Sequence, residues 1–189
     1  MDLFFRIITL LLFGFWQFFW RISEVKADKE KPKSKSLNKI GYLRKYKLHY
    51  VFYFLLCLQI AGLPVLTINY DTQLAGVILV IIGLIISISA RVTLGTNWAH
   101  AAEYQIKKNQ TLITNGIYKY IRNPIYTGLA IGVTGGELVA NSYLFLLFPL
   151  FFFIAYKQAK LEEKILEKHF GKSYTEYKKK SKMLIPFVF

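Results

Sequence analysis

The chain has 189 residues, of which 54% are hydrophobic and 17% aromatic, yet its formal net charge is +14. A nucleic-acid-binding domain this basic would spread Lys and Arg over one folded surface. Here the charges stand in blocks between long uncharged runs, as in membrane proteins. We therefore expect membrane lipids, and no nucleic acid, to contact the basic blocks.

Five apolar runs approach the length of about 17–25 residues that a helix needs to cross a bilayer. They are Leu3–Trp20, Tyr50–Leu66, Leu74–Ala90, Ile125–Ala140 and Tyr143–Tyr156. The first run contains Arg6 near its end, where a long side chain reaches the interface. It has no small-residue cleavage site, so we interpret it as a span and not as a signal peptide. The last two runs are short and predict a tight hairpin joined at Glu137–Ser142, extended by helix outside the hydrocarbon.

Lys and Arg mark which connections lie in the cytoplasm. Arg21–Lys47 carries ten of them, Arg91–Arg122 five and Lys157–Lys182 nine, whereas Pro64–Gln73 and Glu137–Ser142 carry none. The positive-inside rule then places the N-terminus outside and the C-terminus in the cytoplasm. The predicted fold class is all-α, an integral membrane bundle of about five transmembrane helices with a cytoplasmic C-terminal helical segment. The single cysteine, Cys57, allows no disulfide framework.

The distinctive polar residues fall in two cytoplasmic segments, Arg91–Arg122 and Lys157–Phe189. We expect both segments to build any active site. This divides the chain into residues 1–93, with three transmembrane helices and a basic loop at about residues 21–48, and residues 94–189, which carry the site.

The first candidate motif enters the fourth apolar run as Gly116–Gly128, with the sequence GIYKYIRNPIYTG. Pro124 suits the first turn of a helix, and Asn123 before it suits the N-cap. A helix start offers N–H groups that favour an anion such as a ligand carboxylate. From the residues alone the alternative interpretation, a capped membrane helix anchored by interfacial Tyr and Arg side chains, is favoured, because such anchoring is common.

The second candidate motif is Leu161–Gly171, where apolar residues recur with helical spacing and Gly171 is placed to end the helix. Glu162 and Glu163 point about 100° apart, so we expect at most one of them to face a given site. For Glu163 and Glu167 we predict a solvated face with ion pairs to neighbouring lysines. Glu162, beside the apolar stripe, is the candidate ligand-binding acid.

Together these motifs resemble the signature of the isoprenylcysteine carboxyl methyltransferase and phospholipid methyltransferase superfamily, written R-H-P-x-Y-x-G, a hydrophobic stretch and E-E. The matching residues are Arg122-Asn123-Pro124-Ile125-Tyr126-x-Gly128 and Glu162-Glu163, supported by Leu94–Trp98, Gln110–Tyr118 and Phe170–Tyr177. The resemblance covers roughly residues 94–186. It implies an integral membrane enzyme that uses S-adenosyl-L-methionine to methylate a lipophilic or lipidated acceptor, isoprenylcysteine-like or phospholipid-like, at the cytoplasmic face.

The same resemblance implies site residues and makes residues 94–189 the methyltransferase core. Glu162 would bind the ammonium group of the cofactor, and Arg122 would supply local electrostatics for methyl transfer. Gln158 would lie on the substrate side. The implied cofactor-binding set is Glu103, Gln110, Thr111, Leu112, Ile113, Tyr118, Asn123, Pro124, Ile125, Tyr126 and Glu162.

Two positions depart from the family pattern. Asn123 replaces the usual histidine and cannot titrate, which argues against proton transfer there. Gln158 stands where carboxyl methyltransferases of the family have an arginine, and it cannot grip a carboxylate through two cationic donors. We therefore expect poor turnover of prenylcysteine. No metal is expected, because His49, His100 and His169 are scattered along the chain.

Two other function classes compete with the methyltransferase. Membrane lipid reductases that use NADPH resemble this chain, but Ile125 occupies the place of an asparagine in their motif, and Glu162-Glu163 favours the methyltransferases. A non-enzymatic scaffold or transporter is the third class. The clearest spans carry almost no ionisable residues, which argues against an ion path.

The predicted orientation is tested by labelling introduced cysteines in intact cells on a Cys57→Ser background. A thiol-reactive reagent that cannot cross the membrane should label Asn69→Cys and leave Ser36→Cys unlabelled. Labelling of Ser36→Cys from outside would contradict the orientation.

Overall fold

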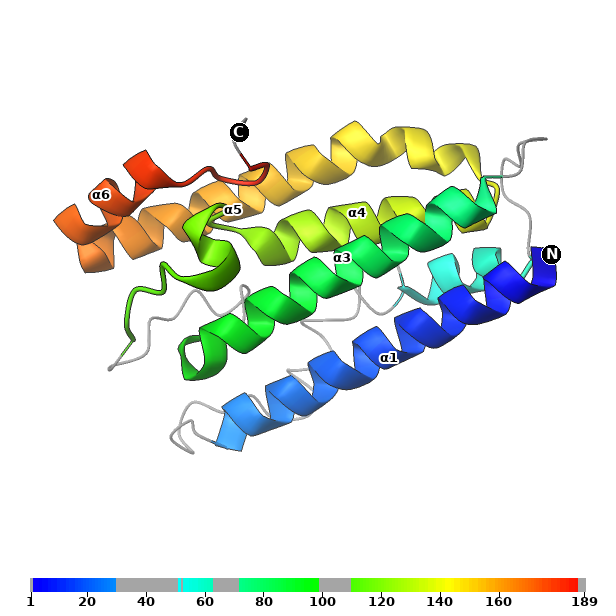
Figure 1. Cartoon of the computed structure of the whole chain (residues 1–189), viewed down its shortest axis with the longest axis horizontal. Coiled ribbons are helices and arrows are strands. Elements are labelled where there is room, and N and C mark those ends of the chain that lie inside the picture. Colours follow the sequence, from blue (N-terminus) through cyan, green and yellow to red (C-terminus); the bar gives the residue numbers. More distant parts are fainter. Residues whose placement is uncertain (1, 30–50, 52, 63–71, 99–109, 187–189) are drawn as a thin grey trace. The chain divides into compact units, whose positions relative to one another are not determined.

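The computed structural model describes residues 2–29, 51, 53–62, 72–98 and 110–186. These residues are almost entirely helical, as Figure 1 shows. The long elements are α1 (Asp2–Lys29), a helix at residues 53–60, α3 (Gln73–Leu94), α4 (Pro124–Val139), α5 (Phe148–Phe170) and α6 (Lys172–Lys180). Three short 3-10 helices are η2 (Gly95–Asn97), η4 (Gly116–Lys119) and η5 (Tyr143–Leu147). The described part forms no β-strand, and its one isolated bridge joins Ile121 to Lys182.

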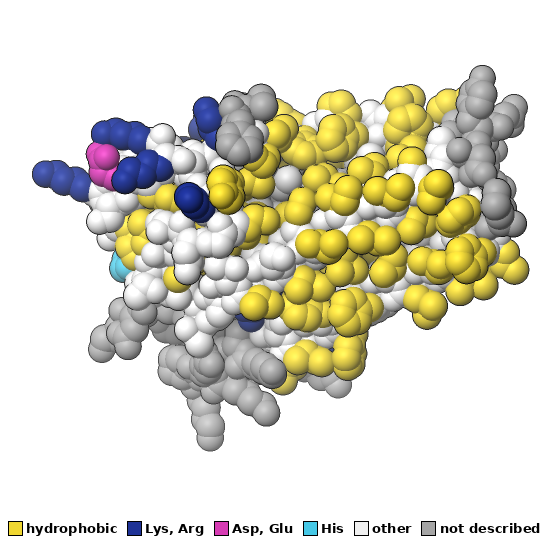
Figure 2. All heavy atoms as spheres, viewed as in Figure 1, with side chains coloured by type: hydrophobic (Ala, Val, Ile, Leu, Met, Phe, Trp, Pro, Cys, Tyr) yellow, Lys and Arg dark blue, Asp and Glu magenta, His cyan; other side chains and the backbone are white. Residues whose placement is uncertain are grey.

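Among the described residues, three segments are long and apolar enough to cross a membrane: Leu3–Val25, Gln73–Asn97 and Tyr143–Phe170. Large apolar side chains such as Phe4, Ile85 and Phe153 remain exposed on them, which is the surface that lipid tails cover. Figure 2 shows this apolar surface, with lysines gathered over α6. The predicted all-α membrane fold is confirmed. The number of five spans stays a prediction, because α4 has 16 residues and the second predicted span is described only in part.

The chain divides into two compact units, and the first contains Met1–Val80 and Gly135–Phe145. Its core forms where Phe13 of α1 meets Tyr53, with ring centroids 6.0 Å apart. Gly136 leaves room for this packing, since a Cβ there would lie 3.2 Å from the Phe13 ring. Arg6 donates from Nη1 to the carbonyl of Ile60 at 3.1 Å, so this cation in the membrane stabilises the end of the helix at residues 53–60.

In the same unit, side chains at the start of α3 satisfy the last carbonyls of α4. Thr72 Oγ1 donates to Leu138 O at 2.7 Å, and Gln73 Nε2 donates to Val139 O at 3.2 Å. The chain then turns, and Ser142 N donates to Glu137 O at 3.0 Å. These bonds replace the helical partners that a helix end lacks. The hairpin predicted at Glu137–Ser142 is confirmed in the structure.

The second unit contains Ile81–Thr134 and Leu146–Phe189. Here α3 and α4 approach so closely that a Cβ on Gly83 would lie 2.5 Å from the carbonyl oxygen of Gly128. Such small-residue contacts let membrane helices pack backbone to backbone. The close contact fixes the first turns of α4 against α3.

The same unit ends in a helical turn and a returning segment. Gly171 has φ +54°, a left-handed conformation that glycine adopts without strain, and it ends α5 as predicted. Tyr174 and Tyr177 then occupy one face of α6 and are buried. Beyond α6, residues 181–184 run back beside the start of α4 (Figure 1). We call residues 181–184 the C-terminal strap.

Candidate active site

The turn before α4 pairs with the C-terminal strap. A residue that precedes proline is pushed towards extended conformations, so Asn123 cannot simply continue a helix into Pro124. The backbone around Asn123 pairs with the strap instead: Arg122 N donates to Lys182 O at 2.8 Å, and Asn123 N donates to Met183 O at 3.1 Å. One turn into α4, Thr127 Oγ1 donates to Leu184 O at 2.7 Å. The strap is therefore attached to both the turn and the helix.

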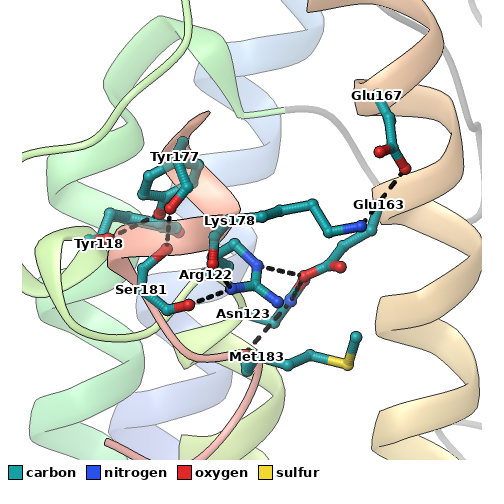
Figure 3. A network of polar contacts seen from close by, with 9 residues as sticks. All are labelled: Tyr118, Arg122, Asn123, Glu163, Glu167, Tyr177, Lys178, Ser181 and Met183. Carbon is teal, nitrogen blue, oxygen red and sulfur yellow. Dashed lines mark hydrogen bonds and ion pairs between the residues drawn. The ribbon is translucent and has the colours of Figure 1, made fainter. Parts of the chain in front are cut away.

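Glu163 of α5 binds the side chains of this turn, as Figure 3 shows. Its Oε1 accepts a hydrogen bond from Arg122 Nε at 2.6 Å and another from Asn123 Nδ2 at 3.1 Å. The ion-paired side chains are 8% and 4% exposed. Arg122 Nη1 also donates to the carbonyls of Ser181 and Lys178. A buried ion pair is tolerated when such additional hydrogen bonds satisfy it.

The prediction of a solvated Glu163 is therefore wrong. Its neighbours in sequence include lysines, but an arginine 41 positions away, held in place by the strap, takes that role. Glu167 does pair with a lysine, yet its partner is Lys178 of α6 at 3.4 Å. Helical spacing indicated which side chains share a face, but not which element packs against it.

Glu162 faces a different group from Glu163, as the 100° separation predicts. Its Oε2 accepts a hydrogen bond from the Tyr126 hydroxyl at 2.9 Å, a contact between residues 36 positions apart. Tyr126 and Glu162 are both half-buried. Two predicted cofactor-binding residues, one from each motif, thus meet in space.

Three buried tyrosines surround these acids. Tyr177 donates its hydroxyl to the carbonyl of Tyr118 at 2.6 Å, and Ser181 Oγ donates to Tyr177 O at 2.8 Å. Burial raises the pKa of Tyr118, and the nearby charge of Glu162 raises it further. Burial likewise raises the pKa of Tyr174 and of Tyr177. All three phenols stay protonated at neutral pH, and the Tyr177 hydroxyl uses its hydrogen to bind the Tyr118 carbonyl.

The predicted cofactor segment at residues 110–113 is attached to the end of α3. Asn97 Oδ1 accepts hydrogen bonds from Thr111 N at 2.7 Å and from Thr111 Oγ1 at 3.2 Å. Farther along, Gly116 has φ +56° and begins η4, which carries Tyr118. Arg91 lies over the Trp98 ring at 4.5 Å from its centroid and so braces the same end of α3.

The structure thus brings part of the predicted site together. Tyr126 and Tyr118 lie near Glu162, whereas Arg122 and Asn123 bind Glu163. Gln158 lies one helical turn before Glu162 on α5. Glu103, His49 and His100 lie outside the described residues. The cofactor and catalytic roles of these residues stay predictions.

Sequence reasoning missed the strap and the tyrosines of α6. Tyr174 and Tyr177 were part of the resemblance but received no role, although their spacing of three places both on one helix face. Ser181, Met183 and Leu184 take part mainly through backbone carbonyls. No side-chain pattern could have indicated those contacts.

Comparison with solved structures identifies the class of fold. The chain superposes on the eukaryotic intramembrane Ras methyltransferase, isoprenylcysteine carboxyl methyltransferase, with a TM-score of 0.61 and 18% identity, covering 100% of this chain and 72% of that one. The two proteins therefore share a membrane-enzyme fold. A family model described as phospholipid methyltransferase matches residues 72–173, more than half of the chain. The chain belongs to the phospholipid methyltransferase family.

Several curated relatives are similar over part of their length. The protein-S-isoprenylcysteine O-methyltransferase of Schizosaccharomyces pombe is 34% identical over 102 residues, covering 53% of this chain and 43% of the relative. A protein of Oryza sativa subsp. indica named "Probable protein-S-isoprenylcysteine O-methyltransferase" is 31% identical over 127 residues, 66% of each chain. The protein-S-isoprenylcysteine O-methyltransferase of Dictyostelium discoideum is 28% identical over 173 residues, covering 90% of this chain and 71% of the relative. The chain thus spans less than two thirds of the length of the rice and fission yeast proteins.

The buried pair predicts a large stability effect at Glu163. Glu163→Gln should lower the free energy of unfolding by about 3–5 kcal/mol, because it leaves the Arg122 charge buried without its counter-ion. Glu167→Gln is the matched control on the same helix, and its partly exposed pair should contribute at most about 1 kcal/mol. Thermal unfolding of the two purified variants in detergent is the measurement. Equal melting temperatures would contradict the assignment of Glu163 as the buried counter-ion.

Proposed function

We propose that this protein is a methyltransferase that uses S-adenosyl-L-methionine to methylate a lipophilic acceptor at the cytoplasmic face of a membrane. Membership of the phospholipid methyltransferase family and relatives named as O-methyltransferases support this reaction class. The observation that carries the proposal is the hydrogen bond between Tyr126 and Glu162 at 2.9 Å. It joins the two halves of the family signature into one group of polar side chains.

The residues present fit the chemistry of the proposed cofactor. The Glu162 carboxylate accepts a bond from Tyr126 at Oε2, and an ionised carboxylate has further lone pairs for an ammonium group. The Tyr118 phenol, kept protonated by its raised pKa, is a donor suited to hydroxyl or carboxylate oxygens, whereas the Tyr126 hydroxyl donates to Glu162. The proposed binding segment at residues 110–113 lies at the end of α3, and Pro124 and Ile125 begin α4. Glu103 is the remaining proposed contact.

When bound, S-adenosyl-L-methionine supplies a methyl group on a sulfonium, which is already a reactive electrophile. The work left to the protein is to orient the acceptor and to exclude water. In this proposal Glu162 and Tyr126 fix the cofactor, and Arg122 contributes positive potential from its buried position. The excess of Lys and Arg in the segments around this site supports a cytoplasmic location. A lipophilic acceptor would enter laterally from the bilayer.

Binding measurements separate the proposed function from its alternatives. Isothermal titration of the detergent-purified protein should show binding of S-adenosyl-L-methionine and S-adenosylhomocysteine and none of NADPH. Glu162→Gln should weaken S-adenosyl-L-methionine binding by about 1.5–3 kcal/mol, the magnitude of a hydrogen bond to a charged group. Glu167→Gln, on the same helix, should bind as the unmodified protein does. NADPH binding would favour a reductase, and equal effects of the two substitutions would remove the role given to Glu162.

The identity of the acceptor depends on position 158. The relatives are named for isoprenylcysteine, whose free carboxylate calls for a cationic partner. Gln158 precedes Glu162 by four residues, so the two side chains share one face of α5. Glutamine carries no charge. The flanking cations, Lys157 and Lys160, are exposed and lie over the rings of Phe153 and Tyr156. We propose that the acceptor is a lipid that needs no fixed cationic clamp, such as a lipid with an amine.

A radiolabelled methyl-transfer assay tests this acceptor preference. The unmodified protein should methylate phosphatidylethanolamine better than a prenylcysteine analogue. Gln158→Arg should raise prenylcysteine turnover at least about tenfold, since a bidentate arginine–carboxylate pair contributes on the order of 1.5–3 kcal/mol. Lys157→Arg is the matched control and should not change the preference. Efficient prenylcysteine methylation by the unmodified protein would refute the proposal.

A further inference from the structure

Asn123 makes two hydrogen bonds from a single nitrogen atom. Its Nδ2 donates to Glu163 Oε1 at 3.1 Å and to the carbonyl of Met183 at 3.3 Å. The residue is 7% exposed. Figure 3 shows the amide between the acid of α5 and the strap. Asn123 therefore connects three segments: the turn before α4, α5 and the strap.

Few side chains have the donors for this arrangement. A primary amide carries two N–H groups on one nitrogen and stays neutral at every physiological pH. A neutral imidazole has a single N–H, and a carboxylate has none. Asn123 can therefore join an acidic side chain to a backbone carbonyl without adding a charge to a buried cluster that already holds Arg122 and Glu163.

The strap held in this way borders the residues proposed to bind the cofactor. Arg122 N and Asn123 N donate to strap carbonyls, and Thr127 Oγ1 donates to Leu184 O. Tyr126 lies between these attachment points in the sequence, and its hydroxyl donates a hydrogen bond to Glu162. Glu162 directly precedes Glu163 on α5. The attachments at Asn123 and Thr127 thus lie on either side of Tyr126, and on α5 Glu163 lies next to Glu162.

We propose that Asn123 and Glu163 are positioning residues that lock the C-terminal strap across the start of α4, and that the locked strap sets Tyr126 and Glu162 for ligand binding. This inference rests on the proposed function, because Tyr126 and Glu162 are taken as its cofactor-binding pair. The strap lies beyond residues 72–173, the part of the chain that matches the family model. It adds to the site a segment that the family signature does not contain.

The decisive variant is Asn123→Asp, which keeps the shape of the side chain and removes both donors. At about pH 8 its carboxylate should repel Glu163 and weaken S-adenosylhomocysteine binding about tenfold or more. Like-charge repulsion raises the pKa of the introduced carboxyl. At about pH 5.5 that carboxyl should hold a proton, donate a hydrogen bond to Glu163 and recover most of the affinity. The readout is the affinity ratio between variant and unmodified protein at each pH.

The groups facing position 123 allow this interpretation of the pH profile. Glu163 on α5 contacts Asn123 and also pairs with Arg122, and Tyr174 and Tyr177 on α6 interact electrostatically with Glu163 and Arg122, as Glu162 does with Tyr174. The two phenols have raised pKa values and remain neutral between pH 5.5 and pH 8 in this experiment, about two units or more below their titration. The introduced carboxyl titrates together with Glu163, which it contacts, and with Glu162 beside it, so the affinity ratio reports the protonation of this coupled group of acids.

Asn115→Asp and Thr134→Val serve as the controls, and Asn123→His and Thr127→Val are further test variants. Asn115→Asp introduces the same charge at an exposed position and should leave the ratio near one at both pH values. Asn123→His keeps one donor of the two and should lose less affinity than Asn123→Asp at about pH 8. Thr127→Val removes the bond to Leu184 without any charge change, whereas Thr134→Val removes an intrahelical bond to Ala130 in the same helix. Only the first of these two should weaken binding.

Hydrogen exchange of the Lys182 amide, which donates to Tyr120 O, reports the strap directly. Its exchange should accelerate in Asn123→Asp and Thr127→Val and stay unchanged in the controls.

If the unmodified protein does not bind S-adenosylhomocysteine, the proposed function fails, while the exchange data still decide whether Asn123 locks the strap. If the unmodified protein binds, an affinity loss that is absent or equal at both pH values overturns the positioning role. Unchanged Lys182 exchange in both variants overturns the lock.

Discussion

One carboxylate oxygen, Glu163 Oε1, receives hydrogen bonds from Arg122 and Asn123 at 2.6 Å and 3.1 Å. These two residues lie in the turn before α4, and Arg122 Nη1 and Asn123 Nδ2 also donate to the carbonyls of Lys178, Ser181 and Met183. A charge in so buried a place must be compensated, because an unpaired ion would cost several kcal/mol. The same electrostatic requirement therefore fixes α5, the start of α4 and the strap relative to one another within this unit.

Much of the local structure could be predicted from the sequence, since it depends on neighbouring residues. Pro124 begins α4 because its missing N–H costs nothing in the first turn, and Gly171 ends α5 in a left-handed conformation. The angular separation of Glu162 and Glu163 also follows from helix geometry alone. That separation is why one acid meets Tyr126 and the other meets Arg122.

The partners of those acids could not be predicted in the same way. Glu163 has lysines beside it in sequence, and local rules favour them, but a partner 41 residues away is held closer by packing. The strap presents backbone carbonyls, which every residue possesses, so its sequence carries no signal for the contacts at Thr127 and Asn123. The resemblance to a family proposes residues for a cofactor site but not their contacts, and in the structure Asn123 binds Glu163 whereas Tyr126 binds Glu162.

The position of the strap in the chain has a consequence for biosynthesis. Residues 181–184 leave the ribosome after α3, α4 and α5, and the segments of α3 and α5 are long and apolar enough to enter the membrane as they are made. Until the strap arrives, Arg122 and Asn123 lack several of their acceptors, and Glu163 must hold them alone. The helices can thus be inserted while the turn at residues 121–123 is still incomplete. Completion of this unit is a late event in translation, separated in time from membrane insertion.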